Sequence, residues 1–348
     1  MATGLQRAIG SVITGIGLVA ITAALQPAAA QQKLSIALPG VPPVFSTAFT
    51  YVAQRAGLYK KYGLDVTLKP MDSGVAAARA VVSGAVDVSL SPTPPVAVMV
   101  SNAGVPLKVV QGLERPDWLI GVMDPSIDSC EKLKGVAVGV DSPRGARWVQ
   151  LQNMVRSCNL LPDRDIPTVN LSANVGPAMV GGQIKAGVLH LDDIPVIERE
   201  SGKKVHVVAR IEETAPGTHY LVVVTTKKTI ADKRDALVRM AAAHIEAIEF
   251  MHDRKNADKV ADYAKPTGRS LSDAKNGLLM YLDFKFWPLN AHGLDQKRVE
   301  KSINIQVAIG KRTKGKSGIN PDKTAVPYQE LADLTIWNDA MAMRKKMN

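Results

Sequence analysis

Cysteine, aromatic residues and long hydrophobic runs are all scarce in this sequence. Its 348 residues include only two cysteines, and 5% of them are aromatic. Two cysteines exclude a small scaffold held together by disulfides, and 27 glycines are too few for collagen, which needs glycine at every third position. A hydrophobic content of 46% is too high for a disordered chain. The composition therefore indicates a folded globular protein.

Hydrophobic runs of membrane-spanning length do not occur after residue 25, which excludes a protein with several transmembrane helices. The segment before it has the parts of an export signal. Arg7 precedes an apolar stretch at residues 8–25, and the alanines at 28–30 form a small-residue cleavage site. We predict a signal peptide at residues 1–30, cleaved after Ala30, and a soluble mature protein in the periplasm. An uncleaved membrane anchor is the alternative.

Positive charge exceeds negative charge, with 43 Lys and Arg against 32 Asp and Glu, and the formal net charge is +11. Such an excess suits nucleic acid, an anionic membrane surface or anionic ligands. The cations are scattered, however, and their one dense cluster spans residues 311–316. Because the chain also lacks a nucleic-acid-binding motif, we expect no nucleic-acid partner.

Residues 310–317 match the phosphate-binding pattern G-x-x-x-x-G-K-[ST] of NTPases. Gly318 and Pro321 follow, and they cannot open the helix whose N-terminus would hold the phosphates. The H-E-x-x-H and G-x-S-x-G signatures do not occur, and the Glu-x-x-His pair of Glu249 and His252 has no second copy. We therefore predict no catalytic residue, no metal site and no cofactor.

A strand–loop–helix pattern occurs twice, about 100 residues apart, as expected for parallel α/β sheets. An apolar strand at residues 33–38 is followed by the Pro- and Gly-rich loop 39–43 and a helix. A strand at 136–140 is followed by the loop 141–145 and a helix at 146–156. The repeat predicts two similar lobes.

The lobes are expected to be joined by two extended apolar segments, at residues 109–122 and 219–224. We assign residues 31–123 and 218–348 to the first lobe and residues 124–217 to the second. The C-terminal part is mainly helical and is expected to pack on the first lobe. Its clearest apolar stripe at helical spacing is Leu237, Ala241, Ile245 and Ile248.

Cys130 and Cys158 flank the second strand–helix unit. Because the chain runs up the strand and back down the helix, both cysteines reach the same edge of the sheet. An oxidising compartment favours a disulfide over a metal site or a catalytic thiol. We predict a bridge between Cys130 and Cys158.

Three segments resemble solute-binding proteins of ABC uptake systems. Residues 51–66, YVAQRAGLYKKYGLDV, are similar to that family's helix followed by G-[LY]-[FY]-KK-x-GLDV. AVVSGAVD at 80–87 is similar to its ALxSGxxD, and LKGVAVGV at 133–140 to its LKGKxVGV. The branch that the chain resembles binds nitrate, aliphatic sulfonates, taurine or thiamine-precursor pyrimidines. Lys185 departs from the family pattern, which usually has Asp at this position.

The resemblance implies an α/β protein with the type II periplasmic-binding-protein fold: two lobes, each a mostly parallel sheet flanked by helices, with a ligand cleft between them. It also implies hinge closure on a small molecule and delivery to an ABC permease in the inner membrane, and we expect a monomer. Pyrimidine-synthase-like enzymes on the same fold are an alternative, but they carry a Cys-rich iron motif that two cysteines cannot supply. A structural or adhesive protein without ligand-dependent closure is the third interpretation.

Ligands of parallel α/β sheets bind beyond the C-terminal ends of the strands, near helix N-termini. The loop at 141–145 is the most informative one there. We expect Ser142 to cap the following helix, Pro143 to occupy its first position, and Arg144 to hold an anion beside exposed backbone N–H groups. The alternative is that Ser142 only caps and Arg144 only faces solvent.

Other candidate ligand-binding residues lie in loops at the same edge or in the crossing segments: Phe45, Ser73, Gly74, Ser91, Thr93, Glu114, Trp118, Asp141, Gly145 and His190. His190 could equally be satisfied by the backbone, and Phe45 could only anchor its helix. A hinge role and a cleft role are equally consistent for the residues of the crossing segments, which are Glu114, Arg115, Trp118, His219 and Tyr220. We predict a carboxylate or sulfonate ligand, with a neutral nitrogen heterocycle such as a thiamine-precursor pyrimidine as the alternative.

Overall fold

The computed structural model describes Met1 and residues 31–143, 145–171 and 175–347, and residues 31–348 form one compact unit. The predicted signal peptide and Arg144 lie outside the described residues. No helix in the described part of the chain is long and apolar enough to span a membrane.

The first lobe is built on a five-stranded sheet in the order β2-β1-β3-β10-β4. Its strands are β1 (Gln32–Pro39), β2 (Leu64–Met71), β3 (Val88–Pro92), β4 (Leu107–Leu113) and β10 (Leu221–Thr226). β1 pairs in parallel with β2 and β3, whereas β10 runs antiparallel between β3 and β4. The sheet is therefore mixed, with its parallel strands ending at one edge.

The second lobe repeats this arrangement with the order β7-β6-β8-β5-β9. Its strands are β5 (Leu119–Val122), β6 (Val138–Val140), β7 (Thr168–Asn170), β8 (Ala186–Leu189) and β9 (His206–Arg210). β6 is parallel to β7 and β8, and β5 is the antiparallel strand. In both lobes the antiparallel strand is the one that has just arrived from the other lobe. The predicted repeat is confirmed, although β6 is shorter than the strand expected at 136–140.

The chain crosses between the lobes at residues 114–118 and again at residues 215–220. The sequence assignment placed β5 in the first lobe, whereas the strand pairs with β8 and β9 of the second sheet. The difference arises because an extended apolar segment reads as a strand without revealing which sheet it joins. The two crossings lie next to each other at the junction of the lobes.

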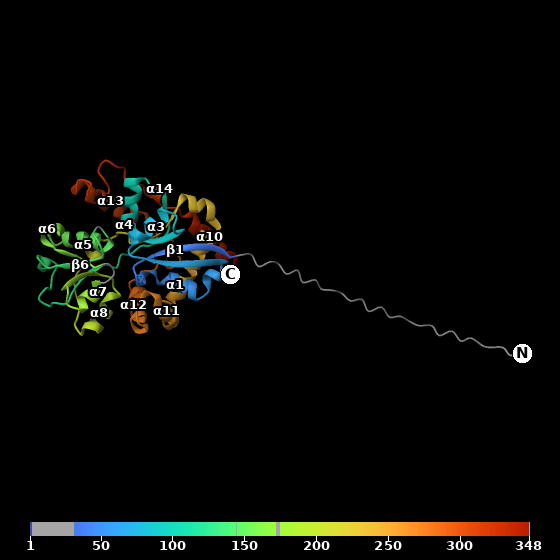
Figure 1. Ribbon diagram of the computed structural model, residues 1–348, viewed down its shortest axis with the longest axis horizontal. Helices are drawn as coiled ribbons and strands as arrows, with labels where there is room; N and C mark the ends of the chain where they lie inside the picture. Colours follow the sequence, from blue (N-terminus) through green and yellow to red (C-terminus); the bar gives the residue numbers. More distant parts are fainter. Residues whose placement is uncertain (2–30, 144, 172–174, 348) are drawn as a thin grey trace. The chain divides into compact units, whose positions relative to one another are not determined.

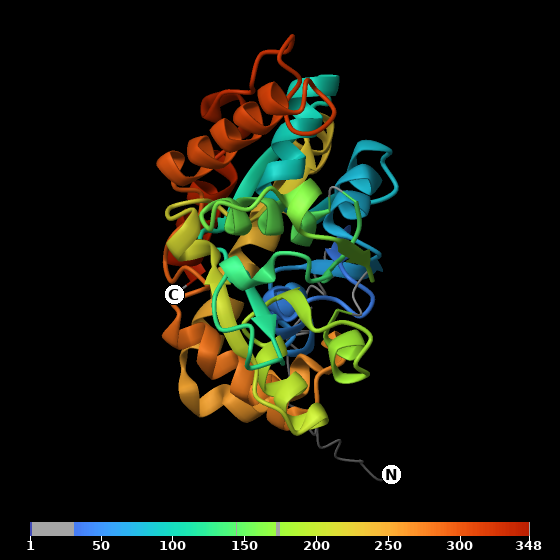
Figure 2. The same cartoon turned by 90° about the vertical axis from the view of Figure 1, so that its left-hand side faces the viewer.

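Helices cover both faces of each sheet (Figures 1 and 2). In the first lobe they are α1 (Ala48–Arg55), which follows the turn η1 (Phe45–Thr47), α2 (Leu58–Lys61), α3 (Gly74–Val82) and α4 (Thr93–Ala103). In the second lobe they are α5 (Ala146–Arg156), α6 (Pro162–Asp165), α7 (Val175–Val180), α8 (Asp193–Ser201) and α9 (Ile211–Thr214), with the short turn η2 (Glu131–Leu133). The observed α5 has the predicted bounds.

The C-terminal part is helical and packs on the first lobe, as predicted. It consists of α10 (Lys227–His252), α11 (Ala257–Tyr263), α12 (Leu271–Asp283), α13 (Gln296–Arg312), α14 (Tyr328–Leu331) and α15 (Thr335–Met347), with the turns η3 (Arg254–Asn256) and η4 (Lys265–Thr267). α10 packs against α1, α2 and α15, and α13 packs against α4. The apolar stripe of α10 is buried from Leu237 to Ile248.

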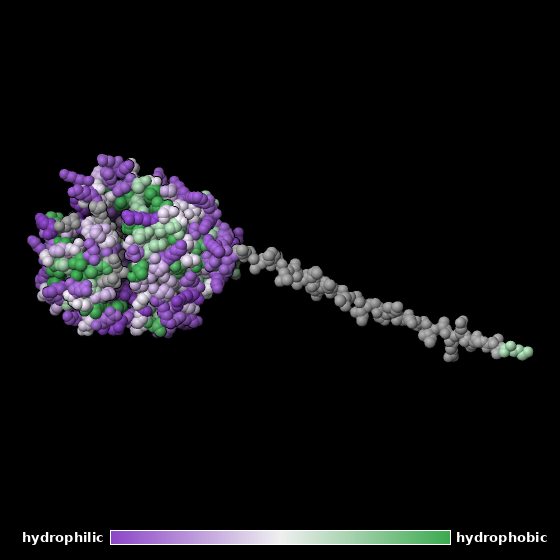
Figure 3. Space-filling view, in the orientation of Figure 1, coloured by the Kyte–Doolittle hydropathy of each residue, from purple (hydrophilic) through white to green (hydrophobic). Residues whose placement is uncertain are grey.

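Hydrophilic residues cover much of the face of the molecule that Figure 3 shows, with small apolar patches between them.

The structure also bears on the phosphate-loop match and on the predicted disulfide. The run at 303–309 before the phosphate-loop match lies within α13 and is not a strand, which agrees with our rejection of an NTPase. Cys130 and Cys158 form the predicted disulfide, with their Cα atoms 5.9 Å apart. Closing a loop of 28 residues in this way stabilises the fold by roughly 3 to 4 kcal/mol in the chain-entropy model.

Candidate functional site

A narrow cavity lies between the lobes where strands β1, β3, β6 and β8 end. We call it the first cavity. The first lobe contributes Pro39, Gly40, Val44, Asp72, Ser73, Gly74, Pro92 and Leu221, the second lobe Asp141, Ala146, Arg147 and His190, and the crossing segments Trp118 and Tyr220. Its volume is about 50 Å³, which is room for a few water molecules. Both lobes and both crossings therefore meet at one site.

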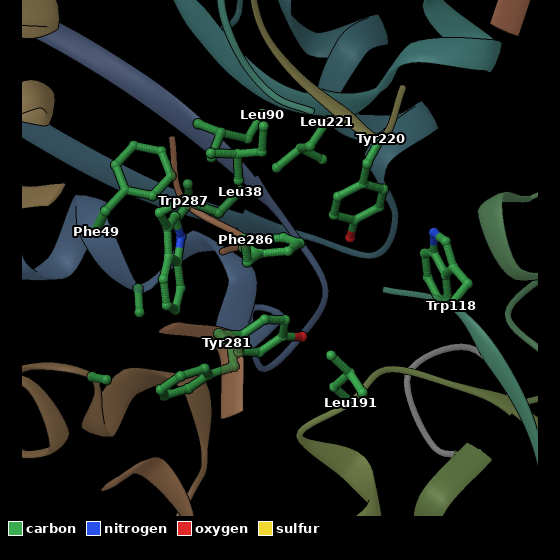
Figure 4. Packing of buried hydrophobic residues seen from close by; sticks show 14 of the residues in the cluster. Leu38, Phe49, Leu90, Trp118, Leu191, Tyr220, Leu221, Tyr281, Phe286 and Trp287 are labelled. Atoms are coloured by element: carbon green, nitrogen blue, oxygen red, sulfur yellow. The ribbon is translucent and has the colours of Figure 1, made fainter. Parts of the chain in front are cut away.

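Aromatic rings form one side of the first cavity. The rings of Trp118 and His190 lie 3.7 Å apart between centroids, and Tyr220 meets Trp118 edge-on at 5.6 Å. Figure 4 shows Trp118 opposite Tyr220, which continues into a group with Tyr281, Phe286 and Trp287. Trp118 Nε1 and His190 Nε2 are buried, and neither has a hydrogen-bond partner in the described part of the chain. Buried polar groups normally find partners, so these two atoms are available to a ligand.

Asp117 fixes the orientation of His190. Its carboxylate lies 2.9 and 3.0 Å from His190 Nδ1, and it also accepts a hydrogen bond from the hydroxyl of Tyr281. A neutral imidazole that donates from Nδ1 presents an acceptor at Nε2, whereas the protonated ring would present a donor. Asp117 thus holds His190 by Nδ1, on the opposite side of the ring from Nε2, and His190 is one of the residues that line the cavity.

Arg147, in the first turn of α5, is the guanidinium of the cleft. It is 7% exposed, and its Nη1 donates to the carbonyl of Val188 and lies 3.6 Å from Asp193. Its guanidinium carbon is 5.3 Å from the centre of the Trp118 ring. We expected Arg144 in this role and did not predict Arg147. The available signal was spacing, because Arg147 precedes the buried Leu151 and Val155 by four and eight residues, on one helix face.

Asp141, and not Ser142, satisfies the start of α5. The Oδ1 atom of Asp141 accepts hydrogen bonds from the backbone N–H groups of Arg147 and Trp148 at 3.1 and 3.4 Å. The N-cap position is occupied by Gly145. Ser142 and Asp141 pack so close to it that a Cβ there would lie 2.4 Å from Ser142 Oγ. The expected cap is therefore wrong. A carboxylate of the chain already takes two of the N–H groups that we expected an anion to use.

The other predicted site residues divide into two groups. Ser73, Gly74, Trp118, Asp141 and His190 line the first cavity, and Phe45 lines a neighbouring cavity. Ser73 also caps α3 by accepting from the N–H of Ala76.

Five predicted residues lie outside the lining of either cavity: Ser91, Thr93, Glu114, Ser142 and Gly145. Ser91 is bonded to Ser89, and Thr93 to His219 and the carbonyl of Tyr220. Both side chains are buried, so their hydrogen bonds stabilise this edge of the sheet and do not face the cavities.

A second cavity of about 210 Å³ adjoins the first and shares Val44, Arg147 and His190 with it. It is closed on one side by Arg269, from the loop before α12, which bonds Asp192 and Asp193 at the start of α8. Burial raises the pKa of Asp193, but the guanidinium groups of Arg269 and Arg147 outweigh it and hold that pKa well below its usual range. Asp193 is therefore a carboxylate at neutral pH.

Comparison with known proteins identifies the family. Residues 44–257 match the family described as NMT1/THI5 like. The chain belongs to the NMT1/THI5-like family. No curated protein sequence matches it.

Solved structures with the same fold are distant in sequence from this NMT1/THI5-like chain. A protein of Bordetella bronchiseptica RB50 is 18% identical, with 91% of this chain and 99% of that one covered and a TM-score of 0.73. The alkanesulfonate-binding protein SsuA from Xanthomonas axonopodis pv. citri, bound to MOPS, is 16% identical (82% and 94% covered, TM-score 0.65). The periplasmic nitrate-binding protein NrtA from Synechocystis PCC 6803 is 11% identical (90% and 89% covered, TM-score 0.65). The fold expected from the sequence is confirmed.

Proposed function

We propose that this protein is an extracytoplasmic solute-binding receptor that captures a small organic molecule between its lobes and delivers it to an ABC permease. The observation that carries this proposal is the pair of buried, unpartnered atoms, Trp118 Nε1 and His190 Nε2, at a cavity built by both lobes. A molecule bound there would contact both lobes at once. Its binding energy would therefore favour the arrangement in which the lobes lie close together.

Localisation and partners follow from the same proposal. The apolar, alanine-ended segment at residues 1–30 supports export, and one of the solved neighbours is described as a periplasmic nitrate-binding protein. We expect a monomer that contacts the permease with both lobes closed on the ligand. A disulfide between Cys130 and Cys158 suits an oxidising compartment.

The cleft favours a flat, neutral or amino-bearing nitrogen heterocycle as the ligand. Two carboxylates, Asp72 and Asp141, line the first cavity, and its guanidinium, Arg147, already interacts with Val188 and Asp193. Rings stack well on Trp118, while ring nitrogens and amino groups can pair with His190 and the carboxylates. The thiamine-precursor pyrimidines of our alternative belong to this class.

An anionic ligand is the second candidate, as first predicted from the sequence. One observation favours it: among the described residues, no acceptor is hydrogen-bonded to Nε or Nη2 of Arg147. A sulfonate or carboxylate could take those N–H groups. The enzyme alternative has less support, because the solved neighbours are described as binding proteins and the described residues include no group of three or more potential metal ligands.

The proposal is tested by thermal unfolding of residues 31–348 with a panel of heterocycles, sulfonates, carboxylates, inorganic oxyanions and amino acids. A ligand at 100 times its Kd adds about 2.7 kcal/mol, which raises Tm by a few degrees. A heterocycle that stabilises the protein supports the first ligand class, and an anion whose effect disappears in Arg147→Gln supports the second. If nothing stabilises the protein and native mass spectrometry finds no bound molecule, the receptor function is wrong.

A further inference from the structure

The second cavity is about four times larger than the first, although the first one has the aromatic rings. The two volumes are about 210 and 50 Å³, and the cavities meet at Val44, Arg147 and His190. Ligand pockets usually begin at about 300 Å³. Neither cavity reaches that size, but together they come close to it.

We propose that the ligand has two parts: a flat ring in the first cavity and a polar arm with acceptor oxygens in the second. This inference rests on the proposed receptor function and specifies the ligand of that site. It predicts a longer solute than a simple sulfonate, nitrate or unsubstituted pyrimidine.

The first cavity suits a small flat ring. Gly40, Gly74, Pro39 and Pro92 of the first lobe line it without charge, and Trp118 lines it from a crossing segment. A Cβ at Gly74 would lie 2.2 Å from the ring of Pro92, so this part of the lining is closely packed. Because the volume is only about 50 Å³, a ring enters when the lobes separate slightly.

The second cavity presents hydrogen-bond donors from both lobes. Arg147 comes from the second lobe and Arg269 from the first, and both line this cavity. Nη1 of Arg269 has no hydrogen-bond acceptor within the described residues, since its bonds to Asp192 and Asp193 use Nε and Nη2. Asp192 and Asp193 pair with the two guanidinium groups, and Glu200 adds a further carboxylate to the lining, so an arm is bound here by its acceptor oxygens and not by net positive charge.

His190 marks the junction of the two parts. Its side chain is 3% exposed, Nδ1 is held by Asp117, and the unpartnered Nε2 belongs to a residue that lines both cavities. A ligand that occupies both cavities would pass the three residues that they share, Val44, Arg147 and His190. A ring-attached amide at that point would give His190 the partner that it lacks.

Matched probes test the proposal on residues 31–348. Nicotinamide supplies the ring amide alone, N-(2-hydroxyethyl)nicotinamide adds a neutral arm, and nicotinoylglycine adds a carboxylate arm. The three corresponding benzoyl compounds, whose ring has no nitrogen, form a second series. We expect at least one arm to lower Kd by tenfold or more relative to its own ring amide, as measured by isothermal titration.

Two variants locate the arm. Gly176→Leu places a side chain in the second cavity, where a Cβ makes ordinary contacts of 3.5 and 3.6 Å with Ile197, and it should remove the gain from the arm while leaving the ring amide unchanged. Ala146→Leu narrows the first cavity and should weaken both probes. Circular dichroism and Tm of each variant verify folding.

Four results would overturn the inference. If the ring amides bind and no arm adds affinity, or if Gly176→Leu weakens both members of a pair equally, the second cavity holds no part of the ligand. If only compact solutes of the wider panel bind, the receptor function stands and the two-part ligand is wrong. Failure of every solute would overturn both.

Discussion

The two lobes have the same strand order, yet they bring different chemistry to the cleft. The first lobe contributes uncharged residues at Pro39, Gly40, Gly74 and Pro92, and its charged groups are Asp72 in the first cavity and Arg269 in the second. The second lobe contributes Asp141, Arg147 and His190, with Asp192 and Asp193 behind them. A repeated topology therefore fixes where loops meet, while the residues in those loops decide what is bound.

The lobes also differ at corresponding turns. Gly84 and Gly182 both have positive φ, at 75° and 72°, and each begins the turn that leads to β3 or β8. Three residues later the first lobe has Asp87 and the second has Lys185. Asp87 accepts from the N–H and hydroxyl of Ser35 and pairs with Lys233, whereas the side chain of Lys185 pairs with Asp124 at the surface. The side chain at this position thus anchors the turn to β1 in one lobe and forms a largely exposed ion pair in the other.

Breaking the contact between the lobes should have the largest effect. Arg269→Ala leaves Asp192 and Asp193 buried without their main partner, and we expect a loss of about 3 to 5 kcal/mol in the free energy of unfolding by urea. The control is Arg254→Ala, whose ion pair with Asp283 is exposed and should contribute less than about 1 kcal/mol. Equal losses in the two variants would mean that the buried pair does not join the lobes.

Replacing Asp87 and Lys185, which occupy corresponding positions in the two turns, should lower the free energy of unfolding by unequal amounts. Asp87→Ala breaks three hydrogen bonds of a partly buried carboxylate, and we expect a cost of about 1.5 to 3 kcal/mol. Lys185→Ala removes an exposed ion pair and should cost at most about 1 kcal/mol. Chemical denaturation of both variants measures the difference. Similar values would show that the turns are anchored alike.

Glycine substitutions compare the two walls of the cleft. Gly74→Ala forces a Cβ to within 2.2 Å of Pro92, and we expect a loss of about 1 to 3 kcal/mol from overpacking. Gly176→Ala meets only ordinary contacts in α7 and should be neutral or stabilising by up to about 1 kcal/mol. Tm measurements of both variants distinguish a rigid first-lobe wall from an adaptable second-lobe wall. A stable Gly74→Ala variant would contradict this contrast.

Low pH should lower the free energy of unfolding, because two histidines of the first lobe are buried. For each histidine, this is the smallest of the four predicted effects. Burial lowers the pKa of His219 to about 4 and that of His244 to about 3. Between those values and the unfolded pKa of about 6.5, the unfolded chain binds more protons, so stability falls as pH falls. We expect about 1 kcal/mol per histidine to be lost between pH 6.5 and 5.5, as measured by urea unfolding.

The variant His244→Gln provides the control for this pH dependence. Its stability should fall by about half as much over the same pH interval, because one histidine still titrates. An unchanged pH dependence would show that His244 does not contribute.

Much of the fold could be predicted from the sequence because the evidence was local. The strand at 33–38, the helix at 146–156 and the disulfide follow from hydrophobic spacing and compartment, and all three are confirmed. The membership of β5 could not be predicted in this way. Its four residues are buried on both sides, and only pairing with β8 and β9 assigns them to the second sheet.

The candidate site was predictable by loop but not by side chain. The loops after β1, β6 and β8 do meet at the cleft, and Trp118 and His190 line it. Arg147 was missed because a charged residue in the first turn of a helix is usually exposed, and here it is buried by Trp118, Val188 and Asp193. Tyr281 and Arg269 were missed because they lie far along the chain from the residues they contact.

The amino-acid sequence by itself determined two α/β lobes, a helical C-terminal part and the edge at which loops gather, because periodicity and turn residues act over a few neighbours. The tertiary structure alone decided that Asp117 orients His190, that Asp141 occupies the start of α5, and that Arg269 joins the lobes. These contacts link residues up to 77 positions apart, and their strength comes from burial, which no local pattern contains.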